Sequence, residues 1–290
     1  MGQLDTIRTR LIPYIQATPL ALILGFFLLL PILLLVAVSF WDFDFARMYP
    51  DFILRNYQET LGSWVTWKTY LNTLKFAFMV WALTLFIGFW VAYFLAFHIR
   101  SALVQSVLFV ICTVPFLTSN IIRMISWRPV LGTEGLINSA LLKMGVIDQP
   151  LQWLLYSDFS VVVAYVHLFT LFMIVPIFNS MARIDKSLLE AAVDAGATRW
   201  GVIWNVVLPL SKTGIALGAL FVVTLVMGDF FVVTVMSGGL SGSATSGIFN
   251  DLQFLNYPRA AASAVILLIV VLLIAASIFR LVDVRKELVR

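Results

Sequence analysis

The sequence predicts an all-α protein that crosses a membrane six times. Of its 290 residues, 61% are hydrophobic and only 12% are charged, whereas a soluble domain is about half apolar and a quarter charged. The apolar residues also gather in six long runs, each near the roughly 20 residues that a helix needs to span a bilayer. These runs cover residues 19–40, 75–97, 103–124, 160–181, 214–236 and 261–282.

The first run has some features of a signal peptide. Ala37, Val38 and Ser39 form an acceptable cleavage triplet, so removal of this segment stays open. Its apolar core is longer than the roughly 7–15 residues of a signal peptide, which favours a retained helix. In the third and fourth runs, Pro115 and Pro176 should kink the helices.

The basic residues predict the orientation. Eleven of the 19 Lys and Arg residues lie on the side that holds both termini, and the other eight are spread over much longer loops. Because Lys and Arg are enriched in cytoplasmic loops, both termini are predicted to be cytoplasmic. The residues on that side are Arg8, Arg10, Arg100, Arg183, Lys186, Arg199, Lys212, Arg280, Arg285, Lys286 and Arg290.

Two segments are expected outside the membrane on the opposite side. Residues 41–67 mix four acidic residues with aromatic ones, as in an external loop near the lipid headgroups; the acids are Asp42, Asp44, Asp51 and Glu59. Residues 135–147 alternate apolar and polar residues. This second pattern predicts a short amphipathic helix on the outer surface.

Residues 190–209 form a charged island between the fourth and fifth apolar runs. Ser187 followed by Glu190 predicts a capping box, with Ser187 as the N-cap of a helix that runs to about residue 195. Gly196 is well placed as the left-handed residue that ends this helix. Glu190 and Asp194, one helical turn apart, offer charge to a partner.

A second short helix is predicted over residues 199–207. Thr198 is expected to cap its start and Pro209 to end it. Two short helices would then meet at a tight corner on the cytoplasmic side. From this pattern alone, a hairpin that merely joins two spans is an equal alternative to a partner-binding loop.

The island resembles the EAA loop of ABC-importer permeases. The matching order is Glu190-Ala191-Ala192, three residues, Gly196, nine residues, Val206, one residue and Leu208-Pro209. The spacing matches throughout, and Val206 stands where isoleucine is usual. In that family the loop is a coupling helix that docks on a cytoplasmic ATPase. The resemblance implies a coupling role for Glu190, Ala191, Ala192, Asp194, Gly196, Leu208 and Pro209.

The resemblance covers residues 57–282, which look like the type I ABC importer transmembrane domain. It implies an N-terminal part (residues 1–66), a transmembrane domain (67–283) with a coupling loop (183–212), and a cytoplasmic tail (284–290). It also implies a bacterial inner-membrane location and three kinds of protein partner. These are a second homologous but distinct permease, two ATPase subunits that bind ATP and Mg, and an extracytoplasmic solute-binding protein.

Shorter motifs resemble the spermidine/putrescine permeases of the first-subunit type. They are Val114-Pro115-Phe116, Ile121-Ile122-Arg123, Gly135-Leu136-Ile137-Asn138 and Gly145-Val146-Ile147-Asp148. The resemblance implies a polyamine substrate. Relatives that carry phosphonates, opines or ferric iron share parts of these motifs and remain alternatives.

Asp229 is the mid-span acid of the fifth run, where an unpaired carboxylate costs several kcal/mol. Together with Phe230 it would suit a polyamine, whose ammonium groups seek carboxylates and aromatic faces. Equally, Asp229 could pair with a basic residue of this chain or cap an unwound turn. Asn120 and Arg123 share a helix face near the end of the third run. Arg123 either extends to the interface or lies on the substrate path, where it would favour a phosphonate over a polyamine.

Several other classes of protein find no support in the sequence. Cys112 is the only cysteine, and His98 and His167 lack metal-ligand spacing. Without a GxxxxGK[ST], HExxH or GxSxG motif, the chain shows no nucleotide site, cofactor site or catalytic residue. The net charge of +4 is too small to indicate nucleic acid. The rivals from other classes are a stand-alone channel or secondary transporter, which predicts more intramembrane charges, and an intramembrane enzyme.

Overall fold

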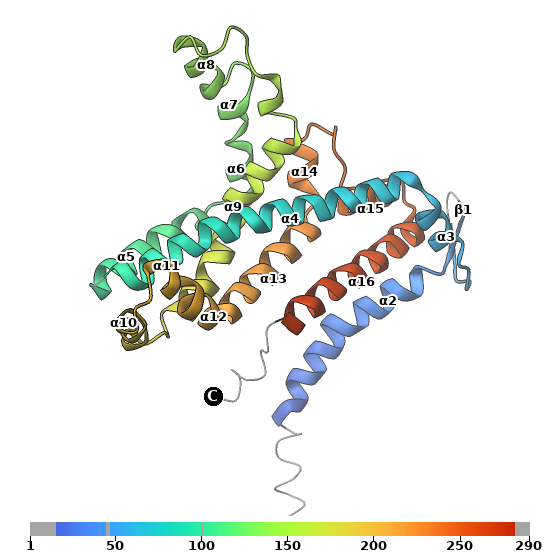
Figure 1. Ribbon diagram of the computed structural model, residues 1–290. Helices are drawn as coiled ribbons and strands as arrows, with labels where there is room; N and C mark the ends of the chain where they lie inside the picture. Colours follow the sequence, from blue (N-terminus) through green and yellow to red (C-terminus); the bar gives the residue numbers. More distant parts are fainter. Residues whose placement is uncertain (1–15, 45–46, 100, 282–290) are drawn as a thin grey trace, which may run out of the picture. The chain divides into compact units, whose positions relative to one another are not determined.

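The computed structural model describes residues 16–44, 47–99 and 101–281, and most of them are helical (Figure 1). Within this part of the chain, four helices are long and apolar enough to cross a membrane, and two bent helix pairs bring the number to six if each pair is one span. The four are Gln16–Val38, Trp64–His98, Asp158–Met181 and Tyr257–Arg280. The pairs are Ala102–Leu117 with Asn120–Lys143 and Arg199–Leu210 with Lys212–Gly228.

The outermost parts of the sequence prediction lie outside the described residues. They are residues 1–15, the tail 284–290 and the basic residues Arg8, Arg10, Arg100, Arg285, Lys286 and Arg290.

The described chain divides into two compact units. Of the described residues, one unit comprises 16–44, 47–63 and 248–267, and the other comprises 64–99, 101–247 and 268–281.

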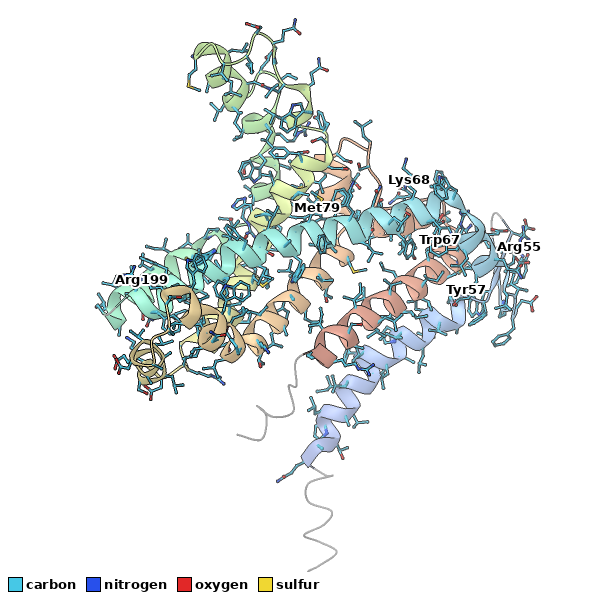
Figure 2. The ribbon with its side chains drawn as sticks, in the orientation of Figure 1. Arg55, Tyr57, Trp67, Lys68, Met79 and Arg199 are labelled. Atoms are coloured by element: carbon cyan, nitrogen blue, oxygen red, sulfur yellow. The ribbon has the colours of Figure 1, made fainter. Side chains whose placement is uncertain are left out.

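The first unit contains a small outer structure that the sequence did not predict. After α2 (Leu30–Val38), strand β1 (Asp42–Asp44) pairs antiparallel with β2 (Arg47–Tyr49), and α3 (Arg55–Gly62) follows. Asn56 of α3 donates to the carbonyls of Ser39 and Trp41 at 3.0 and 2.8 Å. Figure 2 labels Arg55 and Tyr57 on this helix. The unit ends with residues from α15 (Ala244–Gln253) and α16 (Tyr257–Leu281).

The core of the second unit is a bundle of α4 (Trp64–Tyr93), α9 (Asp158–Met181) and α13 (Lys212–Gly228), which pack against one another (Figure 1). Met173 of α9 lies against Gly88 of α4 and Gly218 of α13. A Cβ atom at Gly88 would lie 2.8 Å from Met173 Cγ, and one at Gly218 would lie 2.6 Å from its Sδ. Small residues at these positions let the helix backbones approach closely. The α9 helix runs without a break through Pro176.

We expect Gly218→Leu to destabilise the bundle, because the added side chain has no room beside Met173. Overpacking of this kind costs about 1–3 kcal/mol. The measurement is thermal unfolding of the purified protein in detergent. The matched control is Gly25→Leu, where a new Cβ meets nothing within 4 Å; an equal loss of stability in both variants would contradict the packing argument.

Two of the predicted spans are not continuous helices. The third consists of α5 (Ala102–Thr113), a 3-10 turn (Val114–Leu117) that contains Pro115, and α6 (Asn120–Ile125), with a bend of 90°. The fifth breaks at Asp229 and Phe230, between α13 and α14 (Phe231–Met236). After α6 come α7 (Arg128–Leu131) and α8 (Leu136–Lys143), and α8 lies within the predicted amphipathic segment 135–147.

Candidate functional site

The charged island begins with α10 (Lys186–Asp194), which starts earlier than the sequence indicated. The Oδ1 atom of Asp185 accepts a hydrogen bond from the Ser187 backbone N–H at 3.0 Å. Asp185 is therefore the N-cap, and the capping box predicted from Ser187 is wrong. The same N–H bond holds the pKa of Asp185 below its usual range. Both residues are good N-caps, and the helix starts at the first of them.

Gly196 ends α10 as predicted. Its φ angle is +87°, which lies in the left-handed region that glycine adopts without strain. The Gly196 N–H bonds to the Val193 carbonyl at 2.8 Å, and the Ala197 N–H bonds to the Ala192 carbonyl at 2.9 Å. These two bonds form a Schellman motif. They fix a tight corner between the two helices of the island.

The second helix of the island begins as predicted but ends differently. Thr198 caps α11 (Arg199–Val202) by accepting from the Gly201 N–H at 3.2 Å. A π-helical turn (Ile203–Val207) and α12 (Leu208–Leu210) then continue the helix past Pro209. The prediction that Pro209 ends the helix is wrong. Pro209 lies inside this continuous helix, whose last residue is Leu210.

The two helices of the island differ in burial. No residue of α10 is buried, and Glu190, Ala191 and Asp194 are exposed. The apolar Val193 is also exposed, at 56%. The π-helical turn is anchored instead, since Ile203 and Val207 are buried. The island therefore consists of an exposed helix, α10, and a π-helical turn that is partly buried.

An aromatic contact joins the island to the bundle. Trp200 of α11 meets Trp90 of α4 edge to face, with ring centroids 5.9 Å apart. Figure 2 shows Arg199, the neighbour of Trp200, at the same end of α4.

Asp229 lies at the break between α13 and α14 and has no basic partner among the described residues. Its Oδ1 accepts from the Val232 N–H at 2.8 Å and from the Tyr165 hydroxyl at 3.2 Å. The Thr245 hydroxyl donates to the Asp229 carbonyl at 2.7 Å. Asp229 therefore caps an unwound turn, one of the two roles that the sequence left open.

Tyr165 and Thr245 were absent from the predicted site. Both lie outside the local sequence around Asp229, and neither belongs to a recognisable motif. The available signal was a polar residue, Tyr165, inside the fourth apolar run. Phe230 is partly buried beside Asp229 and packs edge to face with Phe231.

The structure brings Asn120 and Arg123 together, as the shared helix face predicted. The Arg123 guanidinium donates to Asn120 Oδ1. Arg123 is only 6% exposed, so the interpretation that it extends to the membrane interface is wrong. It interacts electrostatically with His167 of α9, two residues from Tyr165 and so about 200° away around the helix. Arg123 and Asp229 therefore lie on different sides of α9.

The island and Asp229 are separate sites at opposite ends of α13. That helix has 17 residues, so about 25 Å of helix axis lies between them. Within the described residues, no group of three or more His, Cys, Asp or Glu side chains could hold a metal ion.

Comparison with known proteins gives one family and several relatives. Residues 84–287 match the family described as binding-protein-dependent transport system inner membrane component. The spermidine/putrescine transport system permease protein PotB of Escherichia coli is 33% identical over 79% of this chain and 82% of that protein. PotB of Haemophilus influenzae is 32% identical over 73% of each chain.

The fold is also shared with a solved structure. A chain in the crystal structure of a bacterial alginate ABC transporter, in complex with an alginate pentasaccharide-bound periplasmic protein, superposes with a TM-score of 0.74. The match covers 95% of both chains at 18% identity. At this identity the likeness concerns the fold alone.

Proposed function

The chain belongs to the family of binding-protein-dependent transport system inner membrane components, and we propose that it imports a polyamine. It is a permease subunit of an ABC importer. The observation that carries the substrate proposal is the 33% identity to a spermidine/putrescine permease over four fifths of both chains. Phosphonates, opine-like or amino-acid-like solutes and ferric iron are the competing substrates.

The proposed topology has six spans, one for each of the six apolar runs of the sequence, and both termini in the cytoplasm. The distribution of Lys and Arg supports it, and so do the apolar helices of the described residues. In this topology the loop 183–212 faces the cytoplasm. The chain is then a multi-pass protein of the bacterial inner membrane.

The proposed assembly pairs this chain with a second, homologous permease to enclose the path between them. A dimer of ATPase subunits, which hold ATP and Mg, binds on the cytoplasmic side, and a solute-binding protein delivers substrate from outside. The exposed α10 with its apolar Val193 supports a docking role. This chain itself supplies no catalytic group in the proposal.

The construction of the island supports a coupling mechanism. A partner that moves α10 also moves α11, because the Schellman corner at Gly196 fixes the angle between them. The Trp200–Trp90 contact passes the motion to α4, and the π-helical turn passes it to α13. The two helices could then shift as rigid elements between inward-open and outward-open arrangements.

At the other end of α13, Asp229 would meet the substrate. Since no basic residue of the described chain neutralises it, its carboxylate can attract an ammonium group. The Tyr165 hydroxyl oxygen lies beside the carboxylate, and the Thr245 hydroxyl oxygen lies beside the Asp229 backbone carbonyl. Both are further acceptors for ammonium hydrogens.

The test of the substrate is ATP hydrolysis by the reconstituted complex, with its binding protein, in the presence of single compounds. We expect spermidine or putrescine to stimulate hydrolysis. Phosphonate, amino acids and ferric iron are the comparison compounds at equal concentration. Stimulation by one of these and not by a polyamine would overturn the substrate proposal and leave the importer assignment intact.

A further inference from the structure

Arg123 is a buried cation for which the described chain supplies no anion. Only 6% of the surface of Arg123 is exposed, and its Nε has no hydrogen-bond partner. The one hydrogen bond recorded for the guanidinium goes to the neutral Asn120 side chain. No carboxylate of the described residues forms an ion pair with it. Uncompensated charge of this kind is strongly unfavourable inside a membrane protein.

Near Arg123, a second hydrogen-bond donor comes from His167 of α9. Trp127 donates its Nε1–H to His167 Nδ1 at 3.0 Å, so in a neutral His167 ring the proton lies on Nε2. His167 is exposed and interacts electrostatically with Arg123. A guanidinium on α6 and an imidazole N–H on α9, which packs against α6, favour a carboxylate as the missing partner.

The surface beside this cluster is an apolar recess of about 500 Å³. Trp127 and His167 form part of its lining. The rest is apolar and comes from α4 and α9: Met79, Leu83, Ile87, Phe159, Val162, Val163 and Val166. Figure 2 labels Met79 partway along α4. A recess of this composition suits an apolar helix and offers few contacts to a hydrophilic solute.

We propose that Arg123, with Asn120 and His167, binds a carboxylate on a membrane-spanning helix of the second permease subunit, and that this helix occupies the recess. The inference rests on the proposed function, which supplies the second permease. The charge also favours the subunit over the substrate, because the proposed substrate is a cation that Arg123 would repel. The buried ion pair would then form only when the two permeases assemble.

The test uses the complex of this chain, the second permease and the ATPase, purified through a tag on this chain. Replacing Arg123 with Met leaves the partner's carboxylate unpaired while filling the space with an apolar chain that the protomer tolerates. We expect Arg123→Met to lower the amount of co-purified second permease by about tenfold or more, and Arg123→Lys to retain most of it. Arg128→Met, a change at an exposed arginine of α7, is the matched control and should leave the complex intact.

Full recovery of the second permease with Arg123→Met would overturn the inference. If uptake is then altered, Arg123 serves the substrate; if uptake is normal, the cluster has no partner. If the proposed function itself is wrong, the co-purification gives another result: the unmodified chain recovers neither the second permease nor the ATPase.

A second measurement locates the partner and leaves Arg123 and Asn120 unchanged. Met79→Cys in a Cys112→Ser background carries a single thiol in the lining of the recess, since Cys112 is the only cysteine. A photoactivated maleimide reagent at this thiol should cross-link to the second permease. Cross-links to lipid alone would contradict the inference.

Discussion

Gly196→Pro is expected to abolish uptake and to release the ATPase from the complex. The corner needs a φ angle of +87° and a Gly196 N–H that bonds to Val193. Proline has neither, since its ring fixes φ near −65° and removes the N–H. The two helices of the island would then lose their fixed angle, and α10 could not dock and move as one body with α11. The measurements are co-purification of the ATPase and uptake by cells that depend on the complex.

Gly201→Ala is the matched control for this prediction. It lies in the same island, and a Cβ there would make only ordinary contacts, the nearest at 3.4 Å to Thr198 Oγ1. We expect it to assemble and transport normally. If Gly196→Pro retained both the ATPase and full uptake, the island would be a simple connection between spans.

Asp229→Asn is expected to lower polyamine uptake by about ten- to a hundredfold while the complex stays assembled. Asparagine can still accept the Val232 N–H as a cap, so the turn is preserved and only the charge is lost. A hydrogen bond to a charged group contributes about 1.5–3 kcal/mol, which corresponds to this range. The measurement is uptake of labelled spermidine at a concentration below saturation.

Asp229→Ala separates the charge from the cap. It removes both, so it should reduce uptake and also destabilise the break between α13 and α14. Normal uptake with Asp229→Asn, combined with loss of stability in Asp229→Ala, would show that Asp229 only caps the turn and has no part in substrate binding.

The elements that the sequence predicted well are those with strong local signals. The fourth run became α9 almost to the residue. Gly196 and Thr198 end and start their helices as expected, because glycine at a helix C-terminus and threonine at an N-terminus act through bonds to their own neighbours.

The predictions were wrong where tertiary contacts decide the structure, or where two neighbouring residues are equally suitable for the same local role. Asp185 and Ser187 are both suitable N-caps, and the pattern favoured the second because Glu190 completes a capping box. The break at Asp229 lies inside an apolar run, and it is held by Tyr165 and Thr245 from elsewhere in the chain. Burial of Arg123 likewise depends on its packing against α9.

The sequence did not predict the β1–β2 hairpin, for a different reason. Its strands have three residues each, too few for an alternating pattern to stand out from a loop. The hydrogen bonds from Asn56 to the Ser39 and Trp41 carbonyls stabilise the segment before the hairpin. No periodic pattern in the sequence indicates these bonds.

The most direct test of the central claim is polyamine uptake into proteoliposomes that contain the purified permease pair and its ATPase. The account predicts that labelled spermidine accumulates only when ATP, the ATPase and the binding protein are all present on their proper sides. Accumulation by this chain alone, without ATP, would contradict the account and identify a channel or secondary transporter.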